Sequence, residues 1–165
     1  MLTEKLLKEL QEYVEKGLQK SICVYKSPII IEADYCLSES IAPYELEGFI
    51  RDHQKPSFRE VLFTLIDKKE LKDAEVYKKA EIDRRHFSKI RSKADYLPKK
   101  HTVIALAFAL TLNVKQAEQL LCAAGYSLSE HETFDLVIRF CLEKKIHDID
   151  DVNSALHYFS LQPLF

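Results

Sequence analysis

Basic side chains are concentrated between Tyr77 and His101. This stretch holds nine Lys or Arg residues against three acids, a net charge of about +6 in a chain whose overall net charge is −2. Such a local excess of positive charge attracts a polyanion. An arginine can donate two hydrogen bonds to O6 and N7 of guanine, whereas a lysine suits a phosphate. The alternative is a solvated helix surface that binds nothing.

Histidine and cysteine residues are too scattered to predict a catalytic or metal site. The six histidines are His53, His86, His101, His131, His147 and His157. No glycine-rich phosphate loop, HExxH, GxSxG or pair of catalytic acids accompanies them. We therefore expect no enzymatic activity, no metal and no cofactor.

The four cysteines form no CxxC pair and have no histidine at a zinc-finger offset. Cys122 and Cys141 lie in apolar helical patterns, so we expect both to be buried as small apolar side chains. Cys23 and Cys36 lie in a less regular stretch. A disulfide between them is conceivable, although it would be unusual in a reducing cytoplasm.

The composition is that of a globular protein of 165 residues, with 47% hydrophobic and 30% charged residues. Three Gly and five Pro predict helices with few tight turns. The N-terminus has no apolar run of signal-peptide or membrane-span length. We expect one domain with an N-terminal extension, a cytoplasmic location and no membrane association.

The N-terminal third contains two expected helices separated by a connector. Apolar residues recur every three or four positions over residues 3–20, which predicts an amphipathic helix that needs an apolar partner. Residues 21–40 break this period and are expected to be extended, with a short strand as one option. Pro43 favours the start of a short helix over residues 43–53.

Capping signals divide the middle of the chain into five expected helices. Ser57 and Glu60 form a capping box that opens the first. Asp73 and Asp83 are expected to cap helices over residues 74–80 and 84–93. Residues 101–112 are apolar on nearly all sides and predict a buried helix. Asn113 with Gln116 opens a fifth helix over residues 114–124, which Gly125 can end in the left-handed conformation.

Two further helices are expected in the C-terminal part. Ser129 with Glu132 forms a capping box before one, and Asp148 starts the other. The last residues, 161–165, are mostly apolar. They are either packed on the domain or offered to a partner.

The order of events over residues 71–93 is that of a helix-turn-helix: a short capped helix, a brief turn ending in Ile82, and a second capped helix. Ile82, Phe87 and Ile90 are expected to point inward and fix the crossing of the two helices. The residues left on or near the outer side are Arg84, Arg85, Ser88, Lys89 and Arg91.

Residues 57–126 resemble the Xre/Cro family of λ-repressor-like helix-turn-helix domains. The likeness rests on the pattern of the two short helices, the proline loop, the apolar helix over 103–110 and the segment AEQLLCAAGY at 117–126. The matching positions in the first part are Leu71, Val76, Ala80, Ile82, Phe87, Ile90 and Pro98. The sequence departs from the family pattern at Asp73, Tyr77 and Glu81, and Glu81 stands where the turn usually has glycine.

The resemblance implies that the helix over residues 83–93 enters the major groove of DNA. Its early residues Asp83, Arg84, Arg85 and Ser88 would then face base edges, although Asp83 has capping as an alternative role. The residues that would contact DNA phosphates are Lys78, Lys79, Lys89, Lys93, Lys99 and Lys100. Arg91, on the same helix, completes the expected DNA-binding set.

These observations predict an all-α protein with a five-helix λ-repressor-like helix-turn-helix core and additional N-terminal and C-terminal helices. The expected divisions are an N-terminal extension and connector at 1–56, the helix-turn-helix domain at 57–126 and a C-terminal helical pair at 127–165. The expected function is that of a DNA-binding transcription regulator. Its expected partners are double-stranded DNA and a second copy of the chain.

A rival hypothesis is a protein-interaction module that reuses the helix-turn-helix scaffold without sequence-specific DNA binding. The departures at Asp73, Tyr77 and Glu81 motivate it, because they change the motif where DNA contact is usual. The N-terminal amphipathic helix or the C-terminal segment 161–165 would then contact a protein partner.

Overall fold

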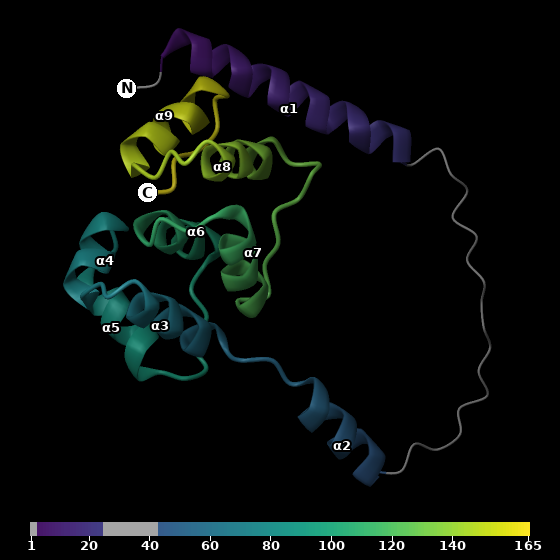
Figure 1. Ribbon diagram of the computed structural model, residues 1–165, viewed down its shortest axis with the longest axis vertical. Helices are drawn as coiled ribbons and strands as arrows, with labels where there is room; N and C mark the ends of the chain where they lie inside the picture. Colours follow the sequence, from purple (N-terminus) through teal and green to yellow (C-terminus); the bar gives the residue numbers. More distant parts are fainter. Residues whose placement is uncertain (1–2, 25–42) are drawn as a thin grey trace.

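The described part of the protein, residues 3–24 and 43–165 of a computed structural model, is all-α (Figure 1). Its helices are α1 (Glu4–Val24), α2 (Pro43–His53), α3 (Phe58–Lys68), α4 (Asp73–Lys79), α5 (Arg84–Ser92), α6 (Lys100–Ala109), α7 (Val114–Ala123), α8 (Thr133–Glu143) and α9 (Ile149–Tyr158). The expected connector at 21–40 is wrong for its first four residues, which continue α1. The rest of that connector lies outside the described residues.

Several expected helix caps are confirmed. Ser57 and Glu60 form the capping box of α3, and Asn113 and Gln116 form that of α7. Hydrogen bonds that the Ser57 amide and hydroxyl donate to Glu60 hold the pKa of this carboxyl below its usual value. The Asp148 carboxylate accepts hydrogen bonds from two amides in the first turn of α9. Each cap supplies acceptors that the first turn of a helix otherwise lacks.

Two expected caps are wrong. Lys72, rather than Asp73, is the N-cap of α4, and the Asp73 carboxylate instead pairs with Arg91. Glu132, rather than Ser129, is the N-cap of α8, because the Ser129 hydroxyl accepts a hydrogen bond from the His131 amide in the preceding loop. In both places a polar side chain finds a different partner nearby.

Six helices end in the same way, with one residue in the left-handed region. These residues are Glu70 (φ 52°), Glu81 (φ 54°), Thr111 (φ 49°), Gly125 (φ 74°), Lys145 (φ 58°) and Ser160 (φ 56°). The amide of the residue that follows each one donates to the carbonyl five positions earlier, for example Leu71 to Ile66. This is the hydrogen-bond pattern of a Schellman motif.

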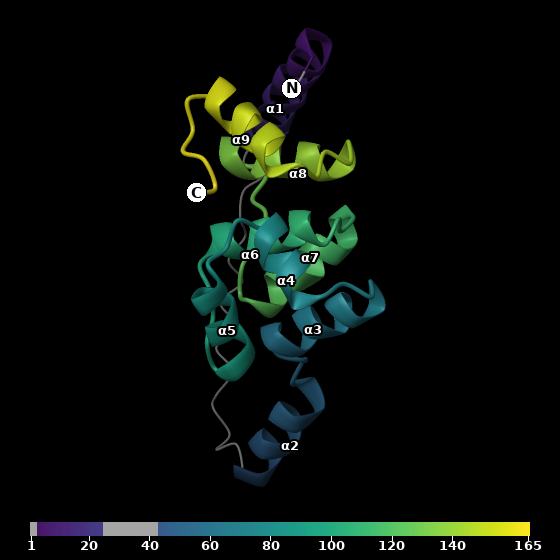
Figure 2. The same ribbon diagram turned by 90° about the vertical axis from the view of Figure 1, so that its left-hand side faces the viewer.

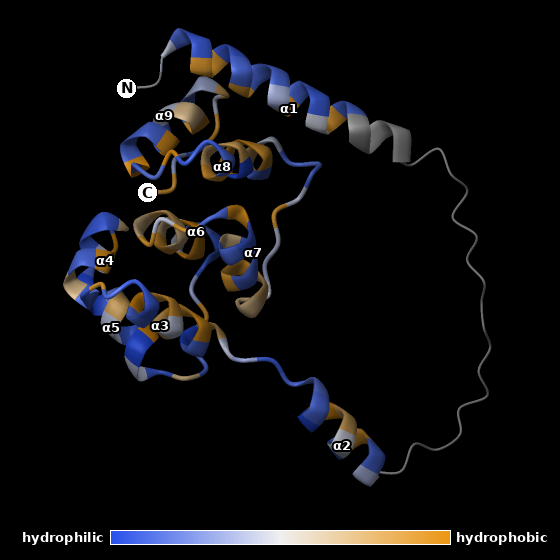
Figure 3. Cartoon of the chain, viewed as in Figure 1, coloured by the Kyte–Doolittle hydropathy of each residue, from blue (hydrophilic) through white to orange (hydrophobic). Residues whose placement is uncertain are grey.

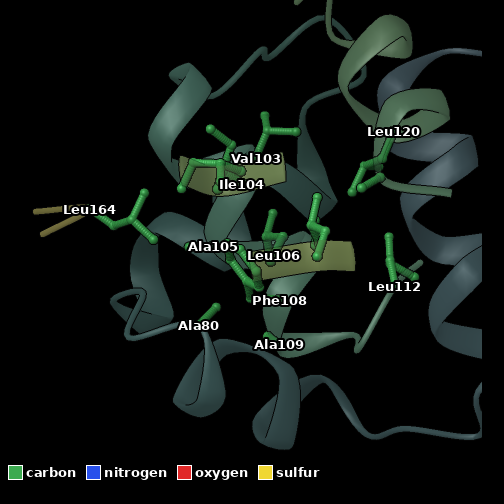
Figure 4. Packing of buried hydrophobic residues seen from close by; sticks show 14 of the residues in the cluster. Ala80, Val103, Ile104, Ala105, Leu106, Phe108, Ala109, Leu112, Leu120 and Leu164 are labelled. Atoms are coloured by element: carbon green, nitrogen blue, oxygen red, sulfur yellow. The ribbon is translucent and has the colours of Figure 1, made fainter. Parts of the chain in front are cut away.

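Helix α6 is the centre of the core. Every residue from Thr102 to Ala109 is buried, and the helix packs against α4, α7 and α9. Leu164 from the C-terminal tail is only 3% exposed and points toward α6 (Figure 4). Its amide donates to the Asn153 side chain over 2.9 Å. The C-terminal segment is therefore packed on the domain rather than free.

Helix α1 lies across α8 at one end of the molecule (Figure 2). Leu10 and Val14 are buried against the core, so the apolar stripe of α1 finds its partner within the chain. Gly17 permits the close approach, because a Cβ there would lie 2.9 Å from Cδ2 of Leu136. At the rim the Tyr13 hydroxyl donates to Glu143 over 2.9 Å.

Of the cysteines with described side chains, Cys141 is buried and Cys122 is exposed. The expectation of two buried thiols is thus confirmed for Cys141 and wrong for Cys122. Burial raises the pKa of the Cys141 thiol to about 12. Among the described helices, none has both the length and the apolar character that a membrane span requires.

Candidate nucleic-acid interface

The inner side of α5 fixes this helix to the core. Phe87 and Ile90 are buried, as is Ile82 in the turn before the helix. The Phe87 ring lies 6.2 Å from the ring of Phe63 on α3 and 5.9 Å from that of Tyr77 on α4, measured between centroids. These three inward positions were predicted from the sequence. They leave α5 a single solvent-facing side.

The start of α5 is capped by Asp83. Its carboxylate accepts a hydrogen bond from the Arg85 amide over 2.7 Å. The Asp83 carboxylate therefore caps the helix, at a position where the resemblance also implied a side chain that faces a base. Negative charge at this point is stabilised by the amides of the first turn.

Three polar residues follow this cap on the outer side of α5: Arg84, Arg85 and Ser88. All three are exposed. Within the described part of the chain, their side chains make no hydrogen bond, ion pair or ring contact. Two guanidinium groups that bind no other described residue are thus presented at the first turn of the helix.

Lys89 is exposed on the next turn of α5 and lies over an aromatic ring. Its Nζ is 4.1 Å from the ring centroid of Tyr96. The Tyr96 hydroxyl lies 3.1 Å from Nε2 of His86, which is a hydrogen-bond distance. This contact holds the loop after α5 against the helix.

Arg91 has a partner within the molecule. Its guanidinium pairs with the Asp73 carboxylate of α4 and lies 4.8 Å from the ring centroid of Phe63. The pair ties the first turn of α4 to the last turn of α5. Arg91 is thus held in an ion pair, whereas the members of the expected set that precede it on α5 form no ion pair with other described residues.

Lys100 also has a partner within the molecule. Its Nζ lies 2.7 Å from Oδ2 of Asp135, which is completely buried in the first turn of α8. The same carboxylate oxygen accepts a hydrogen bond from the Ser129 amide over 2.7 Å. If Lys100 turned toward a phosphate, it would leave a buried carboxylate without its cation, which is costly. Asp135 was not among the residues predicted from the sequence, although an acid inside the apolar stretch TFDLVIRF was a signal for it.

Lys78 and Lys79 are exposed at the end of α4 but lie beside acids. They line a hollow of about 380 Å³ together with Glu81, Asp148 and Asp150. The acids at the start of α9 therefore offset part of the positive charge at the end of α4. The sequence order gave no indication of this, because α4 and α9 are far apart in the chain.

Lys93 and Lys99 flank the loop between α5 and α6. Both are exposed, and no other side chain of the described residues pairs with them. The loop is anchored by Pro98, which is buried and whose carbonyl accepts a hydrogen bond from the Tyr126 hydroxyl over 3.2 Å. The structure thus presents Arg84, Arg85, Ser88, Lys89, Lys93 and Lys99 as cationic or polar groups open to a ligand.

Comparisons with protein-family models, with curated proteins and with solved structures found no match. Over the described residues, no group of three or more His, Cys, Asp or Glu side chains is arranged to hold a metal ion. The interpretation of this surface therefore rests on its own geometry and charge.

Proposed function

We propose that the protein binds double-stranded DNA and that residues 57–126 act as a helix-turn-helix of the Xre/Cro type. The observation that carries the proposal is the arrangement of α5. Its inner side is fixed by Phe87 and Ile90, and its outer side presents Arg84 and Arg85, which pair with no other residue that the structure describes. An α-helix of this kind fits the major groove, where arginine can bind both acceptors of guanine.

The residues of the interface have different roles in this proposal. Arg84, Arg85 and Ser88 face base edges, because they lie on the first turn and a half of α5. Lys89, Lys93 and Lys99 contact the phosphate backbone and set the orientation of the domain. A transcription regulator is the biological role that this mode of binding supports best.

Two cations of the expected set have a structural role instead. Arg91 holds α4 to α5 through Asp73, and Lys100 holds α6 to α8 through Asp135. Both pairs position the surface without contacting DNA. Lys78 and Lys79 contribute less than the other lysines, since Asp148 and Asp150 lie in the same hollow.

The test is fluorescence anisotropy of a labelled mixed-sequence duplex, measured from low to physiological salt. We expect binding that weakens steeply with salt, because phosphate contacts release counterions. Replacing both arginines by alanine (Arg84→Ala with Arg85→Ala) should raise the dissociation constant by about 30-fold or more, since two contacts are lost and each good contact to a base contributes roughly 1–3 kcal/mol. The matched control removes two cations elsewhere, Lys68→Ala with Lys115→Ala.

Equal effects of the two double variants would contradict a specific role of the first turn of α5. Absence of binding even at low salt would contradict the proposal as a whole. It would favour the second candidate, a protein-interaction module. The acids beside Lys78 and Lys79 support that alternative, because they would repel a phosphate backbone that approached the end of α4.

A further inference from the structure

We propose that Tyr96 is a positioning residue of the DNA interface, which holds the Lys89 ammonium where it meets one phosphate backbone of a duplex. The inference rests on the proposed DNA binding and assigns to that binding a residue without a charge of its own. Tyr96 lies in the loop that follows α5, a helix in which hydrophilic residues predominate (Figure 3). It was not among the residues expected from the sequence to contact DNA.

The Tyr96 ring is fixed against one flank of α5. His86, Lys89 and Lys93 follow one another at intervals of three and four residues, which places them on this flank. The rings of Tyr96 and His86 lie 5.9 Å apart between centroids, at 75° to each other. The Tyr96 hydroxyl lies 3.1 Å from His86 Nε2, and the Tyr96 amide donates to the Lys93 carbonyl over 3.3 Å. Tyr96 is therefore held both at its main chain and at its hydroxyl.

The fixed ring gives the Lys89 side chain a defined position. Nζ of Lys89 lies 4.1 Å from the Tyr96 ring centroid, well within the roughly 6 Å over which an aromatic face attracts an ammonium. Lys89 is exposed and forms no hydrogen bond or ion pair with another described residue, so its ammonium remains open to a ligand. A lysine loses side-chain freedom when it binds a phosphate. The contact with Tyr96 removes part of this loss before the duplex arrives.

The charges beside Tyr96 favour a phosphate as the ligand of Lys89. Lys93 and Lys99 are exposed at the two ends of the loop, and Asp95 is the acid between them. Asp95 forms no ion pair with a described residue, so it does not neutralise Lys89. Three lysines against one acid leave this flank of α5 positive, which attracts a polyanion.

Arg91 provides a contrast within the same helix. Its guanidinium also lies beside a ring, 4.8 Å from the centroid of Phe63, but it pairs with the Asp73 carboxylate. The charge of Arg91 is thus already matched inside the protein. Lys89 combines a ring that orders it with a charge that no described carboxylate matches.

Fluorescence anisotropy of a labelled mixed-sequence duplex over a series of salt concentrations tests the proposal. Tyr96→Leu should raise the dissociation constant by about 2- to 5-fold, the effect of losing a cation–π contact at an exposed site. The salt dependence should also become shallower, by at most the roughly 0.9 counterions of one phosphate contact. Tyr96→Phe keeps the ring and should retain the salt dependence of the wild type. The matched control is Tyr158→Leu in α9, which should change neither quantity.

A double-mutant cycle separates positioning of Lys89 from a general loosening of the loop. In a Lys89→Ala background, Tyr96→Leu should have no further effect on the dissociation constant or on its salt dependence. Urea unfolding of each variant ensures that folded proteins are compared. If the wild type binds but Tyr96→Leu binds equally well, or weakens binding as much without Lys89 as with it, the role of Tyr96 is refuted and the proposed DNA binding stands. A wild type that does not bind would overturn both.

Discussion

At the scale of the residue, the backbone is strained at five helix ends. Glu70, Glu81, Thr111, Lys145 and Ser160 all occupy the left-handed region, which costs an L-residue about 1–2 kcal/mol. Glycine takes this conformation without that cost, and here only Gly125 does so among the described helix ends. The hydrogen bonds and the apolar contact that follow each position hold the strained residue in place.

Glu70 is the position at which this strain can be measured most cleanly. It is exposed, and its side chain has no partner within the described part of the chain. Glu70→Gly should be more stable than Glu70→Ala by about 0.5–1 kcal/mol. Glycine relieves the strain of the left-handed conformation, but part of this gain is offset because glycine has more conformational freedom in the unfolded chain. Urea unfolding of the two variants measures the difference. Equal stabilities would contradict the strain.

His147 connects stability to pH. Burial, followed by the nearby charges of Lys69 and Lys145, lowers the pKa of His147 below its ordinary value of 6.5. Its Nδ1 is buried and has no hydrogen-bond partner among the described residues. A histidine with a lowered folded-state pKa binds a proton more readily when the chain unfolds.

The free energy of unfolding should consequently decrease as pH falls below about 6.5, the ordinary pKa of the unfolded histidine. The stability that His147 contributes is fully present above its unfolded-state pKa and is lost below it. Replacing it by glutamine (His147→Gln) should flatten this dependence, which chemical denaturation at several pH values would reveal. An unchanged slope in the variant would assign the effect to other groups.

The inward residues of α5 were predictable from spacing alone, because a helical period of 3.6 residues assigns Phe87 and Ile90 to one face. The ion pairs of this surface were not predictable from the sequence. Arg91 with Asp73 and Lys100 with Asp135 depend on which helices cross, and residue types along the chain do not contain that information. The exposed arginines Arg84 and Arg85 were predicted as outward, but their lack of partners required the structure.

At the scale of the element, two glycines in helices have opposite meanings. Gly17 in α1 faces Leu136 of α8 closely enough that a Cβ would collide, whereas a Cβ at Gly48 in α2 would meet nothing within 4 Å. Gly17 thus allows α1 to lie this close to Leu136 without displacing its side chain. Gly48 has no such packing role and only lowers the stability of helix α2, because glycine has a low helix propensity.

Replacement of Gly17 by leucine (Gly17→Leu) should displace α1 from α8, because the added side chain would start within 2.9 Å of Cδ2 of Leu136, which is only 3% exposed. Hydrogen exchange should then show faster exchange of α1 amides. Gly48→Ala is the matched control and should leave α1 protected while stabilising α2 by roughly 0.5–1 kcal/mol. Full protection of α1 in the leucine variant would refute the close contact.

Most helix bounds followed from capping residues and apolar periods, and they agree with the structure within a few residues. The need of α1 for an apolar partner was also predictable from its stripe. The identity of that partner was not, since α8 lies more than a hundred residues further along the chain. The C-terminal tail left two options in the sequence, and burial of Leu164 decides between them.

At the scale of the whole molecule, one buried cluster extends from Leu10 in α1 to Leu164 in the tail. Helices outside residues 57–126 thus share a core with those inside it. Polar contacts reinforce this, for instance the Lys144 ammonium, which donates to Glu9 over 2.6 Å and lowers the pKa of that carboxyl. The N-terminal helix is part of the folded unit rather than an appendage.

Deletion of residues 1–24 should therefore destabilise the protein. Loss of the buried Leu10 and Val14 side chains alone removes about 3–6 kcal/mol of apolar burial. DNA binding should persist wherever the shortened chain remains folded, because α5 packs on α4 rather than on α1. Thermal unfolding and fluorescence anisotropy of the same sample would measure the two properties. A deletion variant as stable as the full chain would contradict the shared core.

Arg91 and Lys100 each pair with a carboxylate inside the protein, and these pairs limit how strongly salt can weaken the proposed DNA binding. Of the nine cations between Tyr77 and His101, these two already neutralise carboxylates in the free protein, so they displace few additional ions from a duplex. Seven cations remain for the polyanion. The slope of the logarithm of the DNA association constant against the logarithm of salt concentration should accordingly be no steeper than about −6. Each phosphate that is neutralised releases roughly 0.9 counterions, and at most these seven cations can neutralise one each.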